Sequence, residues 1–357
     1  YKAQDILSFN QAINKLKICD PAVGSGHFLV SALNEIIAIK ADLGILADSN
    51  GVRLTGYDVK VENDELIVTY NDNTDIFEYK VTNNSVHNET QRVQKTLFHE
   101  KQNIIENCLF GVDINPSSVK ICRLRLWIEL LKNTYYLEDT QFSELETLPN
   151  IDINIKCGNS LINRLPLHEE LDAVLQGNYS LAAYREAFHK YYHAEGKEEK
   201  RTIEKFIEVV KGDYTSQIYN RDPRIKRLST LRGKRSNLEN TVKIGDLFAR
   251  SKKSDIQGKL LSFQKSIDKI TSEIDDVRNN KVYQNAFEWR IEFPDVLKDN
   301  GSFEGFDVLI GNPPYMFGGN EGIASIDKRF YKEQYLTGGG KINLFTLFIE
   351  RAFNLLR

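Results

Sequence analysis

Short apolar runs alternate along this chain with longer stretches of helical periodicity, and this alternation predicts an α/β fold with parallel strands. Four runs have the length and composition of core strands: residues 15–19, 108–113, 151–160 and 306–311. After the first run, apolar residues recur at helical spacing as far as Leu43. After the second, Asn115 is the predicted N-cap of a helix and Pro116 its first residue. The run at 306–311 is predicted to be a buried strand.

Two stretches interrupt the alternation and are predicted to be insertions. Residues 51–100 contain three strand-like segments, which predict a small antiparallel β-meander, at 59–61, 66–70 and 76–81. A helix is expected to return over about 91–107. Residues 165–286 are helical in pattern, and from Ile256 to Val277 the apolar spacing alternates between four and three, as in a coiled-coil hairpin. The core is accordingly assigned to three segments: 1–50, 101–164 and 287–357.

Composition limits the class of protein. The chain has 357 residues and 41% hydrophobic content, enough for a full core and an additional element. No apolar run approaches the roughly 18 residues that cross a bilayer, so no membrane partner and a cytoplasmic location are expected. The four cysteines lack C-x-x-C spacing and are predicted to be reduced and buried. His189 and His193 have no evident third ligand, so no metal site is predicted. The first residue is Tyr1, and a longer parent protein is expected.

Charge is unevenly distributed along the chain. The net charge is -3, which gives no global signature of nucleic-acid binding. Residues 221–253, however, carry eleven Lys or Arg residues against three acidic ones. Two interpretations stay open: contact with DNA phosphates, through Arg232, Lys234 and Arg235, or a solvated helix face.

The sequence Asn312-Pro313-Pro314-Tyr315 directly follows the last apolar run. Proline has no N–H and a fixed φ, so the pair ends the strand and holds an amide and an aromatic ring at its carboxyl end. Open α/β sheets bind their ligands at that edge. An amide beside a flat ring suits a planar heterocycle with an exocyclic amine. A proline-stiffened turn is the alternative interpretation.

Three other strand ends carry candidate ligand-binding residues. After the first strand, Gly24 and Gly26 permit close approach of a ligand, and Asp20 suits an amino group. The third glycine of a dinucleotide turn is absent, which weakens a pyrophosphate-binding interpretation. Asp113, at the end of the second strand, is placed either to accept ribose hydroxyls or to help cap the next helix. Asn159, at the end of the third, can hydrogen-bond a purine edge.

Taken in order, these segments resemble the motifs of adenine-specific DNA methyltransferases, most closely the gamma-class methylase modules of type IIG-like restriction-modification enzymes. The motifs are D-P-A-V-G-S-G-H-F, G-V-D-I-N-P, C-G-N-S and I-G-N-P-P-Y. The resemblance implies a Rossmann-like, doubly wound, mostly parallel sheet and S-adenosylmethionine as cofactor. It places at the cofactor Asp20, Pro21, Ala22, Gly24, Gly26, Phe28, Asp113, Ile114, Asn159 and Ser160. Many relatives have Asp where this chain has Asn159.

The resemblance further implies methyl transfer to the N6 amine of an adenine flipped out of double-stranded DNA. Asn312, Pro313, Pro314 and Tyr315 would hold that base, without a metal. A target-recognition domain would lie elsewhere in the parent protein, and whether the parent also carries a nuclease domain stays open. Two alternatives stay open. One is a methyltransferase acting on an RNA base or a protein glutamine, and the other is a non-catalytic DNA-binding module with a degenerate methylase fold.

Overall fold

The computed structural model describes residues 2–70, 75–82, 85–151, 153–164, 167, 179–194, 196–221, 223–245, 253–279, 283, 285–316 and 323–357. At its centre is a four-stranded sheet in the order β5-β4-β1-β6, in which every neighbouring pair is parallel. The strands are β1 (Ile18–Asp20), β4 (Leu109–Asp113), β5 (Ile155–Cys157) and β6 (Val308–Leu309). The predicted α/β class with a parallel sheet is confirmed.

Both faces of this sheet are buried, because successive side chains of a strand point to opposite sides. On one face Ile18 and Leu109 join a core formed with the helices α2 (His27–Asp42), α3 (Asn88–Asn107) and α4 (Pro116–Leu131). On the other face Cys19 and Phe110 pack against an aromatic cluster. Covered on both sides, the strands carry the near-continuous apolar runs seen in the sequence.

The aromatic cluster comes from the segment that enters the sheet before β6. This segment includes the short helices α9 (Trp289–Glu292) and η3 (Pro294–Val296). Phe293 and Phe306 meet the ring of Phe110 edge-on, with centroids 5.1 and 5.5 Å away. Edge-to-face contacts of this kind add stability beyond the buried area. The cluster therefore fixes the C-terminal third of the chain against β1 and β4.

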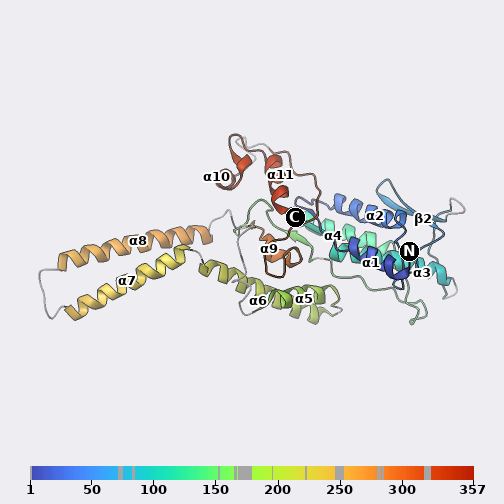
Figure 1. Cartoon of the computed structure of the whole chain (residues 1–357), viewed down its shortest axis with the longest axis horizontal. Helices are drawn as coiled ribbons and strands as arrows, with labels where there is room; N and C mark the ends of the chain where they lie inside the picture. Colours follow the sequence, from blue (N-terminus) through green and yellow to red (C-terminus); the bar gives the residue numbers. More distant parts are fainter. Residues whose placement is uncertain are drawn as a thin grey trace.

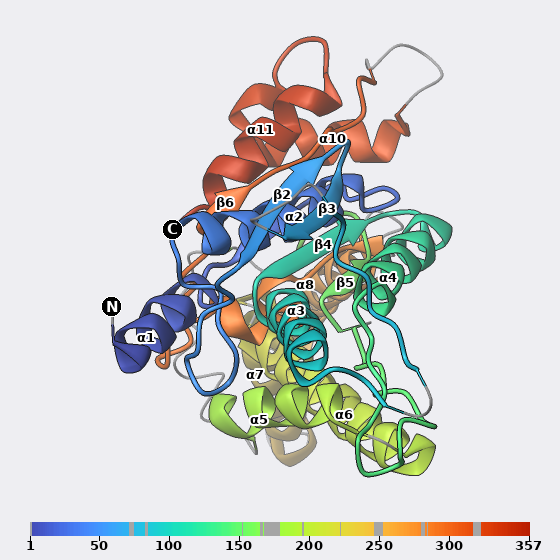
Figure 2. The same cartoon turned by 90° about the vertical axis from the view of Figure 1, so that its right-hand side faces the viewer.

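The expected three-stranded meander is a two-stranded hairpin. β2 (Tyr57–Glu62) and β3 (Glu65–Tyr70) pair antiparallel and lie against α2 (Figure 2). The prediction of a third strand at 76–81 is wrong: beyond a single bridge from Ile76 to Thr69, the described residues there do not continue the ladder. The reason is a competing partner, since the Tyr79 hydroxyl donates to Gln91 on α3 at 2.7 Å. Backbone hydrogen bonds to β3 reach as far as Phe77, which donates to Val68 at 2.8 Å, and beyond it Tyr79 contacts α3 instead.

The helical insertion divides into two parts. α5 (Leu181–Tyr192) and α6 (Lys197–Arg221) pack beside the sheet through buried tyrosines and Phe188. α7 (Pro223–Gly245) and α8 (Lys253–Asn279) extend away from the rest of the molecule as a pair (Figure 1). Leu228, early in α7, packs against Ile267, Ile270 and Ile274 of α8, so the two helices run antiparallel.

Three further helices complete the described chain: α1 (Ala3–Ile13), α10 (Ser325–Gln334) and α11 (Leu344–Leu355), with a short turn η4 (Leu336–Gly338) before α11. None of the helices in the described ranges combines the length and apolar character that a bilayer span requires.

Two predictions of burial are wrong. β6 has only two residues, and Val308 is 39% exposed, because β6 lies at the edge of the described sheet with β1 as its strand partner. Cys157 is exposed, whereas the other three cysteines are buried and all four are free thiols. Cys157 ends β5, at the opposite edge of the same sheet, so the packed helices do not cover it.

Candidate cofactor and target-base site

The turn after β1 is shaped by two glycines. Gly24 and Gly26 have φ angles of 53° and 82°, in the left-handed region that other residues avoid. A side chain at Gly26 would also overlap the thiol of Cys122 on α4. The turn therefore brings the N-terminus of α2 close to α4, and the bare backbone of Gly24 faces the carboxyl edge of the sheet.

Asp20 ends β1 as a buried carboxylate that is only 1% exposed. Its Oδ1 accepts a hydrogen bond from the Ala22 amide at 2.9 Å. Its Oδ2 is buried and has no hydrogen-bond partner in the described part of the chain. Burial, with a smaller contribution from the nearby carboxylate of Asp113, raises the pKa of Asp20 to about 7, although the hydrogen bond from Ala22 opposes this rise. An unpartnered buried oxygen is costly, so this position favours a ligand that can donate a hydrogen bond.

Asp113 links the glycine turn to the next strand. Its Oδ2 accepts from the Gly24 amide at 2.9 Å, and its Oδ1 accepts from the Asn115 amide at 2.7 Å. Asn115 is the N-cap of α4 and accepts from Ser117, with Pro116 as the first helical residue, as predicted. Asp113 thus supports the entry into α4 and also lines a cavity at the sheet edge.

The end of β5 is joined to the end of β1. The Ser160 hydroxyl donates to the Pro21 carbonyl, a bond between residues 139 positions apart. Asn159 donates its backbone N–H to Asn285 at 2.6 Å, and its side chain hydrogen-bonds the hydroxyl of Tyr331. The side-chain Oδ1 of Asn159 also accepts from the Leu161 backbone N–H at 3.1 Å, so Leu161 and Tyr331 hold the Asn159 amide.

The Asn-Pro-Pro-Tyr segment leaves β6 next to the glycine turn. β6 pairs directly with β1, with Leu309 opposite Cys19, so the segment emerges beside Asp20. No hydrogen bond or ion pair joins the Asn312 side chain, which is exposed, to another described residue. The ring of Tyr315 stacks on Phe345 with centroids 5.0 Å apart and planes 15° apart. Tyr315 is still 67% exposed, so its other face is open.

These strand ends surround one cavity of about 270 Å³. The predicted site residues that line it are Pro21, Ala22, Asp113, Ile114, Asn159, Ser160 and Pro314. The other predicted residues lie around it without lining it: Asp20, Gly24, Gly26, Asn312, Pro313 and Tyr315. Phe28 is in the first turn of α2 and 43% exposed.

Sequence reasoning missed the wall of this cavity that α10 and α11 supply. Asp327 and Tyr331, four positions apart on α10, line it together with Leu344 and Phe348 of α11. Burial raises the pKa of Asp327 above its usual range. The periodicity of residues 343–356 predicts a helix with an apolar face, but that pattern does not distinguish packing on a core from lining a ligand site.

The three predicted DNA-contact residues lie on α7, outside this cavity. Arg232 and Lys234 are exposed. Arg235 is half-buried, ion-paired with Glu239 at 2.9 Å and hydrogen-bonded to Gln264 of α8. Arg235 therefore connects α7 with α8, and its contacts with Glu239 and Gln264 leave it poorly placed to bind a phosphate.

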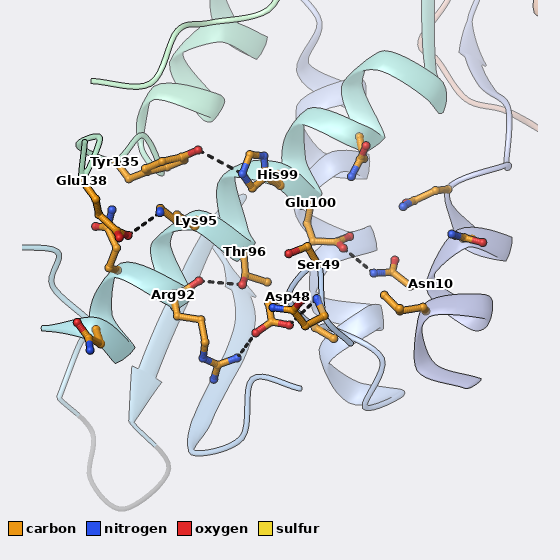
Figure 3. A pocket seen from close by; sticks show the side chains of 18 residues that line it. Asn10, Asp48, Ser49, Arg92, Lys95, Thr96, His99, Glu100, Tyr135 and Glu138 are labelled. Atoms are coloured by element: carbon orange, nitrogen blue, oxygen red, sulfur yellow. Dashed lines mark hydrogen bonds and ion pairs between the residues drawn. The ribbon is translucent and has the colours of Figure 1, made fainter. Parts of the chain in front are cut away.

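A larger cavity of about 850 Å³ lies between α1, α3 and the segment around Asp48 (Figure 3). Its cations are already paired: Arg92 with Asp48 at 3.1 Å and Lys95 with Glu138 at 2.6 Å. None of the predicted site residues lines it. The ends of the parallel strands therefore remain the candidate site.

Two family models match this sequence. The Eco57I restriction-modification methylase model matches residues 107–357, which include β4, β5, β6 and the Asn-Pro-Pro-Tyr segment. The chain belongs to the Eco57I restriction-modification methylase family. The MmeI DNA-methyltransferase domain model matches residues 1–169, which include the glycine turn. The two matches together cover every strand end that borders the cavity.

A curated relative agrees with this membership. It is named "Putative type II restriction enzyme and methyltransferase RM.MjaORFECS2P", from Methanocaldococcus jannaschii. It is 27% identical over 365 residues, an alignment that covers 98% of this chain and 26% of the relative. The chain thus spans about a quarter of the length of that relative.

Proposed function

We propose that this Eco57I-family module transfers a methyl group from S-adenosylmethionine to the exocyclic N6 amine of an adenine in DNA. One observation carries the proposal: the parallel pairing of β1 with β6 sets the glycine turn and the Asn-Pro-Pro-Tyr segment side by side. A methyl donor bound over the first and an amine held by the second would then meet at one edge of the sheet. Family membership supports DNA as the substrate.

The residues present fit S-adenosylmethionine, which when bound supplies the sulfonium methyl group. Asp20 offers its unpartnered Oδ2 to the cofactor's amino group. Asp113 has lone pairs left for ribose hydroxyls, since each oxygen accepts only one bond within the chain. The cavity, at about 270 Å³, is slightly below the roughly 300–1,000 Å³ of complete ligand pockets. It suits the nucleoside part, with the amino-acid part over the open glycine turn.

Asn312 and Pro313 would act on the target amine. The lone pair of that nitrogen is delocalised into the purine ring, so the nitrogen is a poor nucleophile. Accepting its two hydrogens at the Asn312 amide oxygen and the Pro313 carbonyl favours tetrahedral geometry and localises the lone pair. The open face of Tyr315 would stack on the purine, and Phe345 supports the other face. The base must leave the duplex to reach this pocket.

Replacement of Asn312 tests the proposal. We expect Asn312→Ala to reduce methylation of unmethylated genomic DNA by at least about 100-fold, the usual effect of losing a hydrogen-bonding group aimed at the reacting atoms. Binding of S-adenosylmethionine should change less than twofold, because Asn312 does not line the cofactor cavity. Asn103→Ala is the matched control, an exposed asparagine on α3. Unchanged turnover in Asn312→Ala would refute the role of this residue.

The same assay separates the alternatives. Methyl transfer to DNA, but not to tRNA or protein in parallel reactions, supports the proposal. Methylation of tRNA or of a protein glutamine would show that the Asn-Pro-Pro-Tyr segment holds a different planar amide or amine. Failure of the intact protein to bind S-adenosylmethionine would favour a non-catalytic DNA-binding module.

A further inference from the structure

The pair α7–α8, called here the basic arm, is a surface that methyl transfer at the cavity does not explain. It is held together by a narrow apolar seam, and α8 alone has 27 residues, about 40 Å at 1.5 Å per residue. Figure 1 shows it projecting beyond the helices that cover the sheet. Its outer surface is therefore available to a partner.

By sequence α7 carries seven Lys or Arg residues and one acidic residue, whereas α8 carries five of each, so the cationic excess of the basic arm lies on α7. Within residues 225–240 and 257–272, seven cations are exposed and have no ion-pair partner among the described residues: Lys226, Arg227, Arg232, Lys234, Lys259, Lys265 and Lys269. The acidic side chains in these ranges are Glu239, paired with Arg235, and Asp268, which accepts from Gln264 at 2.6 Å. This excess stands on a chain whose net charge is -3.

A solvated helix face does not account for this pattern. Solvated helix pairs normally alternate charge sign along their flanks, which gives attraction between neighbouring turns. α6 is close to this balance, with six Lys or Arg residues against five acidic ones. α7 lacks this balance, with Glu239 as its single acidic residue, so its cations repel one another unless an anion neutralises them.

The base of the basic arm is attached to the candidate site. Beyond α8 the chain returns to the sheet edge, where Asn285 accepts the backbone N–H of Asn159 at 2.6 Å and Ala286 forms a parallel bridge with Asn159. Tyr283 meets the ring of Phe330 on α10 with centroids 5.8 Å apart. The segment just beyond α8 therefore packs against Asn159, which lines the cavity, and against α10.

We propose that the basic arm binds the phosphate backbone of the duplex whose adenine occupies the site, on one flank of that base. This inference rests on the proposed function, because it places the DNA at the Asn-Pro-Pro-Tyr segment. Phosphate contacts position a duplex without reading its sequence. An arm of about 40 Å spans about 12 base-pair steps at 3.4 Å each. The exposed cations fit this ligand, whereas Arg235 is used within the arm itself.

The salt dependence of DNA binding tests this inference in the intact protein. The arm variant combines Arg227→Gln, Arg232→Gln and Lys234→Gln. Since each phosphate contact contributes about 0.9 to the slope of log K against log salt, we expect the slope to become shallower by about 2 to 3. The matched control combines Lys197→Gln, Arg201→Gln and Lys205→Gln, which removes the same charge from α6. Equal slopes in the arm variant and the wild type would overturn the inference.

Duplex length gives a second readout. Extending a duplex from about 6 to about 20 base pairs on both sides of a methylated site should tighten binding of the wild type and the α6 control, but not of the arm variant. A gain of the same size in the arm variant would overturn the inference. Circular dichroism shows whether the arm remains helical, and glutamine is a good helix former, so the substitutions preserve it.

Failure of the two proposals can be told apart. If the basic arm positions the duplex, the arm variant should need more DNA than the wild type to reach half of its maximal methylation rate. Asn312→Ala should lose methylation while keeping the wild-type salt slope. If the arm variant keeps the wild-type salt slope and Asn312→Ala is inactive, phosphate binding by the basic arm is refuted, but the proposed methyl transfer is not. If the arm variant has a shallower salt slope and Asn312→Ala is fully active, the base-binding role of Asn312 is refuted, but phosphate binding by the basic arm is not.

Discussion

A methyl group placed on Gly311 would lie 2.5 Å from Oδ1 of Asp20. The two residues are at neighbouring strand ends, since β6 and β1 pair in parallel. Asp20 carries the carboxylate proposed to bind the cofactor, and Gly311 directly precedes Asn312, proposed to hold the target amine. The absence of a side chain at Gly311 therefore sets how closely the two halves of the site approach.

Gly311→Ala should move the proposed cofactor-binding carboxylate of Asp20 away from the proposed amine-binding Asn312. The added carbon must displace either the Asp20 carboxylate or the β6 end, and a misplacement of about 1 Å costs on the order of 100-fold in rate. We expect methylation to fall by that factor while the protein stays folded. The matched control is Gly339→Ala, at a φ of −69° with no neighbouring atom within 4 Å. Equal activity of Gly311→Ala and Gly339→Ala would contradict the close contact between Gly311 and Asp20.

Asp20 should make folding stability depend on pH. Burial raises its pKa to about 7, so between about pH 4 and 7 the folded protein binds a proton that the unfolded chain has released. This stability is complete below about pH 4 and is lost as pH rises through 7. Asp20→Asn removes the titration. Its free energy of unfolding relative to wild type should rise by on the order of 4 kcal/mol from pH 4 to pH 8.

Urea denaturation without cofactor, at several pH values, measures this difference. Asp42→Asn, at an exposed position at the end of α2, is the control for the loss of one carboxylate. A constant difference between Asp20→Asn and the wild type across the range would show that Asp20 is ionised in the folded protein throughout.

Tyr331→Phe should weaken cofactor binding. The Tyr331 hydroxyl hydrogen-bonds the Asn159 side chain, and the ring itself would be retained. Losing one hydrogen bond of about 1 kcal/mol predicts about fivefold weaker binding of S-adenosylmethionine by calorimetry. Turnover at saturating cofactor should stay within twofold, because Tyr331 only positions Asn159. Tyr57→Phe, in the β2–β3 hairpin, is the control, and equal affinities in the two variants would remove Asn159 from the cofactor site.

Phe306→Ala should destabilise the whole fold. Phe306 is fully buried and its ring contacts Phe110, Trp289 and Phe293. Large-to-small replacement of a core aromatic costs about 3–5 kcal/mol, which chemical denaturation would measure. Phe353→Ala is the matched control: this ring is 72% exposed, so the change should stay within about 0.5 kcal/mol. A small effect at Phe306 would mean that β6 is held by its ladder and not by the aromatic cluster.

Local motifs were predictable where neighbouring residues alone decide the conformation. Asn115 and Pro116 start α4 as predicted, because a cap and a first-turn proline act within one turn of helix. The segment at 76–81 has strand propensity but makes only one bridge, since the decisive partner of Tyr79 is Gln91 on α3. Strand propensity does not indicate that a side-chain partner on a distant helix competes with the next strand.

The candidate site likewise contains residues that were predictable from local sequence and residues that were not. The residues at strand ends were identifiable from proline, glycine and carboxylate placement. Tyr331 and Asp327 were not, because their helix carries no distinguishing pattern and its position over the cavity depends on packing. Arg235 was grouped with exposed cations, since a run of basic residues does not reveal which member meets Gln264 across a helix pair.

By itself, the sequence determined the parallel α/β class, the left-handed glycine turn, the stiff double-proline end of β6 and the family to which the chain belongs. These follow from φ limits, strand periodicity and short motifs, which act over a few residues. Only the tertiary structure decided that β6 lies beside β1, that Ser160 bonds Pro21, and which cations of the basic arm stay unpaired. Those relationships join residues far apart in the chain, and they form because burying both faces of the sheet brings those residues together.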